Sequence, residues 1–251
     1  MTGSRAAVVV AAWLAVLGTT VGLTVALLSV LRDPAPILEY DAAQLASSVP
    51  TAAVTSVAPG PAGTTPVVDP AWVQRTAAGT GLPAAAVRAY ATASVRLGDE
   101  QPGCNLGWST LAGIGEVESV HGTLGGRTLL ADGRPSQPII GPTLDGRGAV
   151  AAIRASGSAT ALHGDPTWDH AVGPLQFLPS TWAQWGGDGD GDGVTDPQDL
   201  DDAAYAAGRY LCASGGDLAQ GPAWQQAVFS YNHAATYVAA VYAAALRFSD
   251  G

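Results

Sequence analysis

An uncharged run near the start of the chain, the 26 residues from Ala6 to Leu31, most constrains how the chain can fold. A transmembrane helix needs about 20 apolar residues, whereas the apolar part of a cleaved signal peptide usually has about 7 to 15. The run therefore predicts a signal anchor over residues 1–32, with a single membrane pass and the rest of the chain outside the cytoplasm. Cleavage, which would release a secreted protein, is the alternative. Arg5 and Arg32 flank the run equally and hardly orient it.

Prolines interrupt the next segment, residues 33–69, which is also rich in Ala, Thr and Val and has no helical period. Such a composition is typical of a tether between a membrane and a folded domain. Residues 70–251 are then expected to form one domain. With 47% hydrophobic residues, the chain can bury a sizeable core.

Charge is distributed unevenly along the chain. The net charge is −10, and the eleven basic residues are all arginines. No basic patch is therefore available to neutralise phosphates, and nucleic acid is excluded as a partner. Seven aspartates fall between residues 188 and 202, so the acidity indicates a local site.

Apolar periodicity predicts a mainly α fold after the anchor and linker. Residues 123–172 are otherwise rich in Gly, Pro and Asp, and we expect loops and short strands there that line a groove. Asp69 and Pro70 are typical of an N-cap and a first helical residue. Helices are expected at about residues 70–78, 83–97, 107–122, 148–155, 180–185, 199–214 and 222–248.

The helix at Gly107–Gly122 places a carboxylate on an apolar face. At about 100° per residue, Leu111, Ile114 and Glu118 share one stripe, whereas Glu116 lies opposite and faces solvent. Burial disfavours the charged form of a carboxyl group, raises its pKa and makes it a usable general acid near neutrality. Glu118 is thus the candidate catalytic residue. A partly exposed glutamate rescued by hydrogen bonds is the alternative.

Two further groups of residues are expected to stabilise the fold: a pair of cysteines and an acidic loop. Cys104 and Cys212 are the only cysteines, and outside the cytoplasm they are expected to form a disulfide, with two buried thiols as the alternative. The run DGDGDGVTDPQD at residues 188–199 matches a calcium-loop template, with glycine at its sixth position. It predicts a structural Ca²⁺, with a solvated acidic turn as the alternative. The expected ligands are Asp188, Asp190, Asp192, the carbonyl of Val194, and Asp199.

Four motifs occur in a fixed order, namely GIGEVESVHG, AVGPLQFLPSTW, DGDGDG and SYNH. Together they resemble the lytic murein transglycosylase B family in its actinobacterial form, over about residues 70–248. The resemblance implies a lysozyme-like α+β domain that cleaves the β-1,4 bond between N-acetylmuramic acid and N-acetylglucosamine in peptidoglycan glycan strands. It also implies that Glu118 acts first as acid and then as base, which closes a 1,6-anhydro ring.

The resemblance extends to the substrate groove. Ser119 matches the serine beside the family's glutamate, and Gln176 and Tyr231 match positions that line the sugar groove. Trp168 lies beside the second motif and is expected to stack on a sugar ring. No catalytic cofactor is expected, and a metal bound by Glu118, His121 and His233 is disfavoured, because such spacing often arises by chance.

Two alternatives in function stay open. A hydrolytic muramidase would need a second carboxylate about 5 to 9.5 Å from Glu118, for which Asp165 and Asp169 are the candidates. Glu116 cannot supply it, because two residues along a helix turn a side chain to the other face. A catalytically silent, calcium-stabilised wall-binding domain is the second alternative.

Overall fold

The computed structural model describes residues 49–50, 52–55, 57–58, 65–148 and 150–249. This part of the chain is mainly helical, as predicted, with eight helices and one pair of short antiparallel strands. Within it, no helix is long and apolar enough to cross a bilayer. The predicted anchor, residues 1–32, lies outside the described residues.

The elements follow the predicted periodicity closely in most of the chain. Asp69 caps the first helix through a bond from the Ala71 N–H to its Oδ1 (2.9 Å), and Gly81 ends that helix in a left-handed conformation. In chain order, the elements are β1 (Val57–Ala58), β2 (Val67–Val68), α3 (Pro70–Thr80), α4 (Ala84–Glu100), α5 (Trp108–Ser119), α6 (Gly157–His163), α7 (Pro179–Trp185), α8 (Leu200–Gly215), α9 (Gly221–Tyr231) and α10 (Ala235–Ser249).

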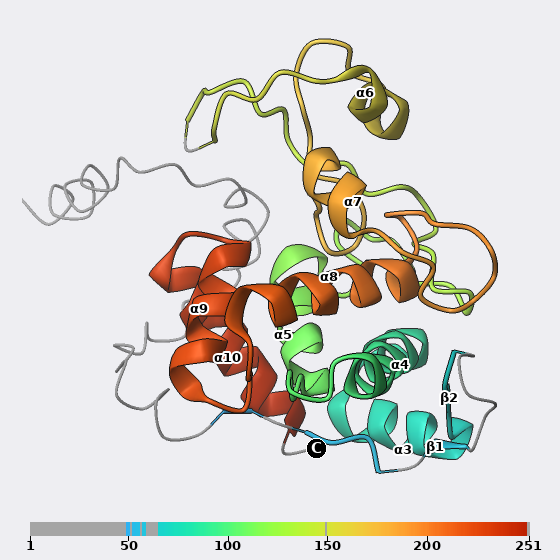
Figure 1. Ribbon diagram of the computed structural model, residues 1–251. Coiled ribbons are helices and arrows are strands. Elements are labelled where there is room, and N and C mark those ends of the chain that lie inside the picture. Colours follow the sequence, from blue (N-terminus) through green and yellow to red (C-terminus); the bar gives the residue numbers. More distant parts are fainter. Residues whose placement is uncertain (1–48, 51, 56, 59–64, 149, 250–251) are drawn as a thin grey trace, which may run out of the picture.

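The central helix of the bundle is α5, which lies between α4 and α10 (Figure 1). Leu111 and Ile114 on its predicted apolar stripe are fully buried. Two glycines permit the close packing: a Cβ on Gly113 would lie 2.6 Å from the Val241 carbonyl oxygen of α10, and one on Gly115 would collide with the Tyr90 hydroxyl of α4. The helix that carries Glu118 is therefore clamped on two sides.

Residues 123–148 and 150–178, which we call the loop layer, are mostly loops apart from α6, and α6 lies above α7 in Figure 1. The predicted helix at residues 148–155 is wrong. Ala152 pairs with Asp145 and Arg154 pairs with Trp168 in isolated bridges, so the described residues there are extended. The helix begins later, at Gly157, where the Ser156 hydroxyl accepts the Ala159 N–H (3.2 Å).

The single helix predicted at residues 222–248 is also wrong, because it is divided into α9 and α10. Asn232 leaves the helical conformation (φ −144°, ψ 119°), and its carbonyl accepts the Ala234 N–H (2.7 Å). The break re-aims the chain and brings the rings of Tyr231 and Tyr237 into a parallel stack, with centroids 6.4 Å apart.

Part of the segment predicted as a linker contacts the helical domain. The Ser109 hydroxyl of α5 donates to the Pro50 carbonyl (2.9 Å), and β1 pairs with β2 immediately before α3. Val68 of β2 is buried in the core. The chain therefore packs against the domain before residue 70, where the sequence placed the domain boundary.

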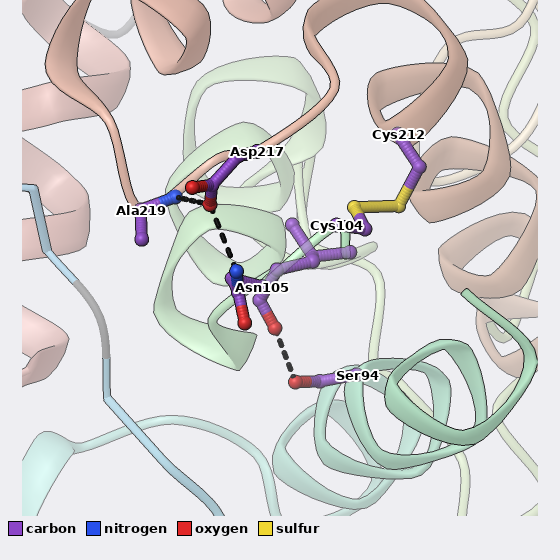
Figure 2. The surroundings of a disulfide bond; sticks show 7 residues. Ser94, Cys104, Asn105, Cys212, Asp217 and Ala219 are labelled. Atoms are coloured by element: carbon purple, nitrogen blue, oxygen red, sulfur yellow. Dashed lines mark hydrogen bonds between the residues drawn. A yellow bond between two sulfur atoms is a disulfide. The ribbon is translucent and has the colours of Figure 1, made fainter. Parts of the chain in front are cut away.

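The predicted disulfide is confirmed. Cys104, which precedes α5, is bonded to Cys212 in α8, with Cα atoms 5.3 Å apart (Figure 2). Hydrogen bonds join the same two regions: the Leu218 N–H donates to the Cys104 carbonyl (2.7 Å), and the Asn105 amide donates to Asp217 (2.8 Å). The start of α5 is thereby fixed to the α8–α9 turn.

Candidate active site

Glu118 lies in the last turn of α5 and is 4% exposed, as its place on the apolar stripe predicted. Its Oε1 accepts a hydrogen bond from the Tyr237 hydroxyl of α10 (2.7 Å). Burial raises the pKa of Glu118 to about 8, and the bond from Tyr237 opposes this rise. Glu118 is therefore protonated at neutral pH, which is the state that a general acid requires.

An aromatic pair connects Glu118 to the loop that carries Gln176. Tyr237 stacks on Tyr231, whose hydroxyl donates to the Leu175 carbonyl (2.8 Å). Burial is the larger cause that raises the pKa of Tyr231 and of Tyr237 well above the ordinary value of a tyrosine, and the charge of the neighbouring Glu118 is the next. Both phenols are thus fixed as neutral hydrogen-bond donors beside the acid.

Ser119 fastens the same loop to α5. Its hydroxyl donates to the Pro174 carbonyl (2.6 Å) and accepts the Gly122 N–H (2.7 Å), and its side chain is buried. Both interactions of the hydroxyl are within the protein. The structure therefore gives Ser119 a role in holding the loop beside Glu118.

Gln176 stands on this loop in a strained backbone conformation, with φ of +51°. Its amide donates to the Gly173 carbonyl (2.9 Å), and its Oε1 lies so close to Gly141 that a Cβ there would be 2.6 Å away. A non-glycine residue at positive φ persists where its surroundings enforce it, which is frequent at functional sites. The side chain stays half-exposed, so it is accessible to a ligand.

Trp168 is half-buried and lies in the loop layer, where the Arg154 guanidinium stacks on its ring at 3.9 Å. Its backbone N–H donates to Asp165, and neither its hydrogen bond nor its ring contact is with Glu118 or Tyr237. Two of the predicted groove residues lie near Glu118. Tyr231 is linked to Glu118 through Tyr237, and Ser119 follows Glu118 in the sequence.

The candidate second carboxylates have other partners. Oδ1 of Asp169 accepts bonds from His163 Nε2 (2.9 Å) and from the His170 N–H (3.0 Å). Asp165 accepts the N–H groups of Thr167 and Trp168, which lower its pKa. No acidic side chain is among the causes that shift the pKa of Glu118.

The acidic loop between α7 and α8 brings together part of the predicted ligand set. Carboxylate oxygens of Asp188, Asp190 and Asp202 lie within 4.8 Å of one another, and Asp202 was not predicted. Among the described residues, this is the only such group of possible metal ligands. Asp202 belongs to the first turn of α8, beyond the twelve residues of the loop template, and this explains why the template missed it.

The remaining predicted ligands have separate contacts. The Asp192 carboxylate accepts the Val194 N–H (2.7 Å), and Val194 is half-exposed. Asp199 caps α8 by accepting the Asp201 N–H (2.9 Å) and lies 3.5 Å from Arg134. Burial raises the pKa of Asp199 to about 7 and that of Asp202 to about 6.

Two residues of the site were missed by sequence reasoning. No motif in the sequence indicates Tyr237, because its hydrogen bond to Glu118 joins residues 119 positions apart. Asn232 follows Tyr231 in the fourth motif, and both polar atoms of its buried side chain lack a hydrogen-bond partner among the described residues. Because a buried amide without partners is costly, Asn232 points to a ligand or water that would complete its bonding.

A comparison with protein families agrees with this geometry in part. Residues 149–229 match the model of the Transglycosylase SLT domain. The matched segment contains Trp168, Gln176 and the acidic loop. It contains neither Glu118 nor Tyr237. A search of the curated proteins finds no match.

Proposed function

We propose that this protein is a peptidoglycan lytic transglycosylase, which breaks the β-1,4 bond between N-acetylmuramic acid and N-acetylglucosamine without water. The observation that carries the proposal is the environment of Glu118: it is buried, its pKa is about 8, and no acidic neighbour contributes to that value. The Transglycosylase SLT domain match supports the same class of reaction.

Each step of the reaction uses the one carboxyl group. Protonated Glu118 donates its proton to the glycosidic oxygen, and the bond from that oxygen to muramic C1 breaks. The resulting carboxylate takes the proton from the C6 hydroxyl of the same muramic residue, whose oxygen then bonds to C1. The products are a 1,6-anhydro end and a free hydroxyl on the leaving sugar, and Glu118 is again protonated.

Tyr237 selects the oxygen that carries the proton. Because its hydroxyl donates to Oε1, the transferable proton belongs on Oε2. After the first step, the same bond stabilises the carboxylate, because hydrogen bonds to the charged form favour it. The neutral phenol of Tyr237 thus allows one residue to act as acid and then as base.

The substrate groove is proposed to follow the loop at residues 174–176 and the break between α9 and α10. The exposed part of Gln176 offers donors and an acceptor to a sugar acetamido group. Tyr231 forms an aromatic wall, and Trp168 offers a further ring. These groups are common in carbohydrate sites, where they combine ring stacking with directed hydrogen bonds.

A hydrolytic muramidase has less support. It would need a second carboxylate to activate water or to form a covalent intermediate. Asp169, the candidate, has its Oδ1 engaged by His163 and by its neighbour's N–H.

The acidic loop is proposed to hold a structural Ca²⁺. Three carboxylates within 4.8 Å supply the hard oxygen ligands that Ca²⁺ prefers. The ion would offset the charge that burial and neighbouring carboxylates make costly at Asp202. Its ligands would be Asp188, Asp190 and Asp202, and it would join the loop to the start of α8.

The location of the domain is also a proposal. The apolar run at residues 6–31 is proposed to anchor the chain, with the domain on the extracytoplasmic side, where its glycan substrate lies. The Cys104–Cys212 disulfide is typical of that oxidising compartment.

The proposal is tested by turnover of purified peptidoglycan with the full-length protein and with Glu118→Gln, which keeps the shape but cannot donate a proton. The wild type is expected to release soluble glycan fragments, and the variant is expected to lose at least about 10³-fold in rate, as proton transfer and positioning fail together. Tyr242→Phe, a change of similar size in α10, serves as a control for folding. A wild type without turnover would favour the wall-binding alternative.

A further inference from the structure

The helix that carries Glu118 ends in an unusual turn. Val120, His121 and Gly122 all have positive φ (51°, 56° and 83°), directly after Glu118 and Ser119. A left-handed conformation is rare for a β-branched residue such as Val120. Strain of this kind persists only where the surrounding structure enforces it, so the contacts that hold the turn also set the direction of the end of α5.

Backbone N–H groups hold part of this turn. The His121 N–H reaches back to the Gly115 carbonyl (2.9 Å), and the Gly122 N–H donates to the Ser119 hydroxyl (2.7 Å). Val120 contributes its own N–H to Glu116 of the preceding helical turn (3.1 Å). These three bonds stay within residues 115–122.

The side chain of His121 supplies the anchor to neighbouring helices. Its ring is 3% exposed, with Nδ1 3.1 Å from the Tyr90 hydroxyl of α4 and Nε2 2.8 Å from Glu116 Oε2. The contact with Glu116 is short, although it lies off the line of the Nε2–H bond. The ring also meets Phe248 of α10 edge-on, with centroids 5.6 Å apart.

The partners of His121 hold opposite forms. The pKa of Glu116 is lowered by His121 and then by Arg247, so Glu116 presents a charged carboxylate to Nε2. Burial raises the pKa of Tyr90 far above its ordinary value, so its hydroxyl keeps a proton that it can donate to Nδ1. The two ring nitrogens of His121 therefore lie between the Tyr90 hydroxyl and the Glu116 carboxylate.

The packing of α4 on α5 leaves room for the contact between Tyr90 and His121. The Tyr90 hydroxyl reaches His121 across Gly115, where any side chain would collide with it. On the other side, Arg247 of α10 lies 3.5 Å from Glu116 Oε1. The imidazole thus connects α4, α5 and α10 at the point where α5 ends.

We propose that His121 is a positioning residue for Glu118. Through Tyr90 and Glu116 it fixes the left-handed turn, and the turn fixes the direction in which α5 presents Glu118 and the Ser119 hydroxyl. His121 itself does not touch substrate. This inference rests on the proposed function, because its effect is measured in the reaction of Glu118.

The test compares His121→Leu with His121→Asn in peptidoglycan turnover by the full-length protein. Leucine fills the space but has no ring nitrogens, and it is poorly suited to positive φ. We expect kcat to fall about 10²-fold with KM nearly unchanged, since a small misplacement of a catalytic group has an effect of this size. Asparagine tolerates the left-handed conformation and can hydrogen-bond, so it is expected to recover about tenfold of the loss.

A pH profile separates positioning from general loss of stability. In the wild type, kcat/KM should fall above a pKa of about 8, where Glu118 loses its proton. Displacement of α5 in His121→Leu should relax the burial of Glu118 and move this basic limb to lower pH. Leu218→Ala, a buried truncation near the α8–α9 turn, is the control that lowers the melting temperature without moving the limb.

Tyr90→Phe gives a second, milder variant, because it removes only the hydroxyl that meets Nδ1. It is expected to lower kcat about tenfold and to shift the limb in the same direction. If turnover depends on Glu118 while His121→Leu and Tyr90→Phe match Leu218→Ala in kcat and in the pH limb, His121 has no positioning role. If Glu118→Gln keeps full activity, the proposed function itself fails, whatever the His121 variants do.

Discussion

The raised pKa of Glu118 suits it to proton transfer but lowers the free energy of unfolding at neutral pH. Its pKa is about 8 in the folded chain, whereas an unfolded glutamate titrates near 4.5. Between these two values the unfolded state loses a proton that the folded state keeps. The free energy of unfolding contributed by this residue therefore falls as pH rises through that window, by up to ~5 kcal/mol for a shift of this size.

Replacement of Glu118 by Gln should remove this pH dependence. The variant is expected to be more stable than the wild type at pH 8 by about 1–4 kcal/mol, and nearly equal to it at about pH 4. Urea unfolding at the two pH values measures the difference. Equal stability of the two proteins at both would mean that Glu118 is not held protonated by burial.

Tyr237 is expected to tune the acid. Its hydrogen bond lowers the pKa of Glu118, so Tyr237→Phe should move the basic limb of the kcat/KM profile to higher pH. Tyr231→Phe is the matched control, because its hydroxyl bonds the Leu175 carbonyl instead. A limb that moves in both variants, or in neither, would contradict a specific role for the Tyr237 bond.

At the scale of elements, the central feature is the close contact of α5 with its neighbours. Gly113→Ala would place a Cβ 2.6 Å from the Val241 carbonyl oxygen, and backbone cannot move aside as a side chain can. We expect a loss of about 1–3 kcal/mol in unfolding free energy, together with lower turnover because α5 shifts.

The control for that change is Gly98→Ala in α4, where nothing lies within 4 Å of the added Cβ. Alanine at an unstrained helical position usually stabilises by about 0.4–1 kcal/mol. Thermal or urea unfolding of both variants distinguishes the two effects. If Gly113→Ala were as stable as Gly98→Ala, the packing of α5 on α10 would be looser than described.

The acidic loop offers a second test at this scale. Ca²⁺ should raise the melting temperature, because a ligand that binds only the folded state stabilises it by mass action. Asp190→Asn should remove most of this rise, because Asp190 belongs to the three-carboxylate group. Asp192→Asn should retain it, because Asp192 does not belong to this group.

The two aspartate variants separate the ligand set of the structure from that of the loop template. Loss of the Ca²⁺ effect in Asp192→Asn as well as in Asp190→Asn would favour the template. A melting temperature that chelator leaves unchanged in the wild type would rule out a structural ion.

At the scale of the whole molecule, the sequence predicted the features that depend on neighbouring residues, such as which face of a helix is buried and where a helix begins. The stripe of Leu111 and Ile114 placed Glu118 inward correctly, since the helical period alone decides which face is buried. Asp69 and Pro70 located the start of α3 for the same reason. Cys104 and Cys212 had no other cysteine partners in the sequence.

The errors arose where tertiary contacts override local preference. The period of apolar residues continues across Asn232, so the pattern gave no sign of the break between α9 and α10. Residues 148–155 are rich in alanine, yet pairing with the neighbouring loop segments holds the described part of them extended. The Tyr237 bond to Glu118 depends on how α10 meets α5, which no single segment encodes.

The central claim is that one carboxyl group cleaves the glycan with no second carboxylate and no water. The most direct measurement is mass spectrometry of the fragments that the full-length protein releases from purified peptidoglycan in water labelled with a heavy oxygen isotope. Intramolecular closure by the C6 hydroxyl predicts 1,6-anhydro-muramic ends, one water lighter than reducing ends and free of label, that disappear with Glu118→Gln. Reducing ends that carry the heavy oxygen would contradict the account, because they require water to attack C1.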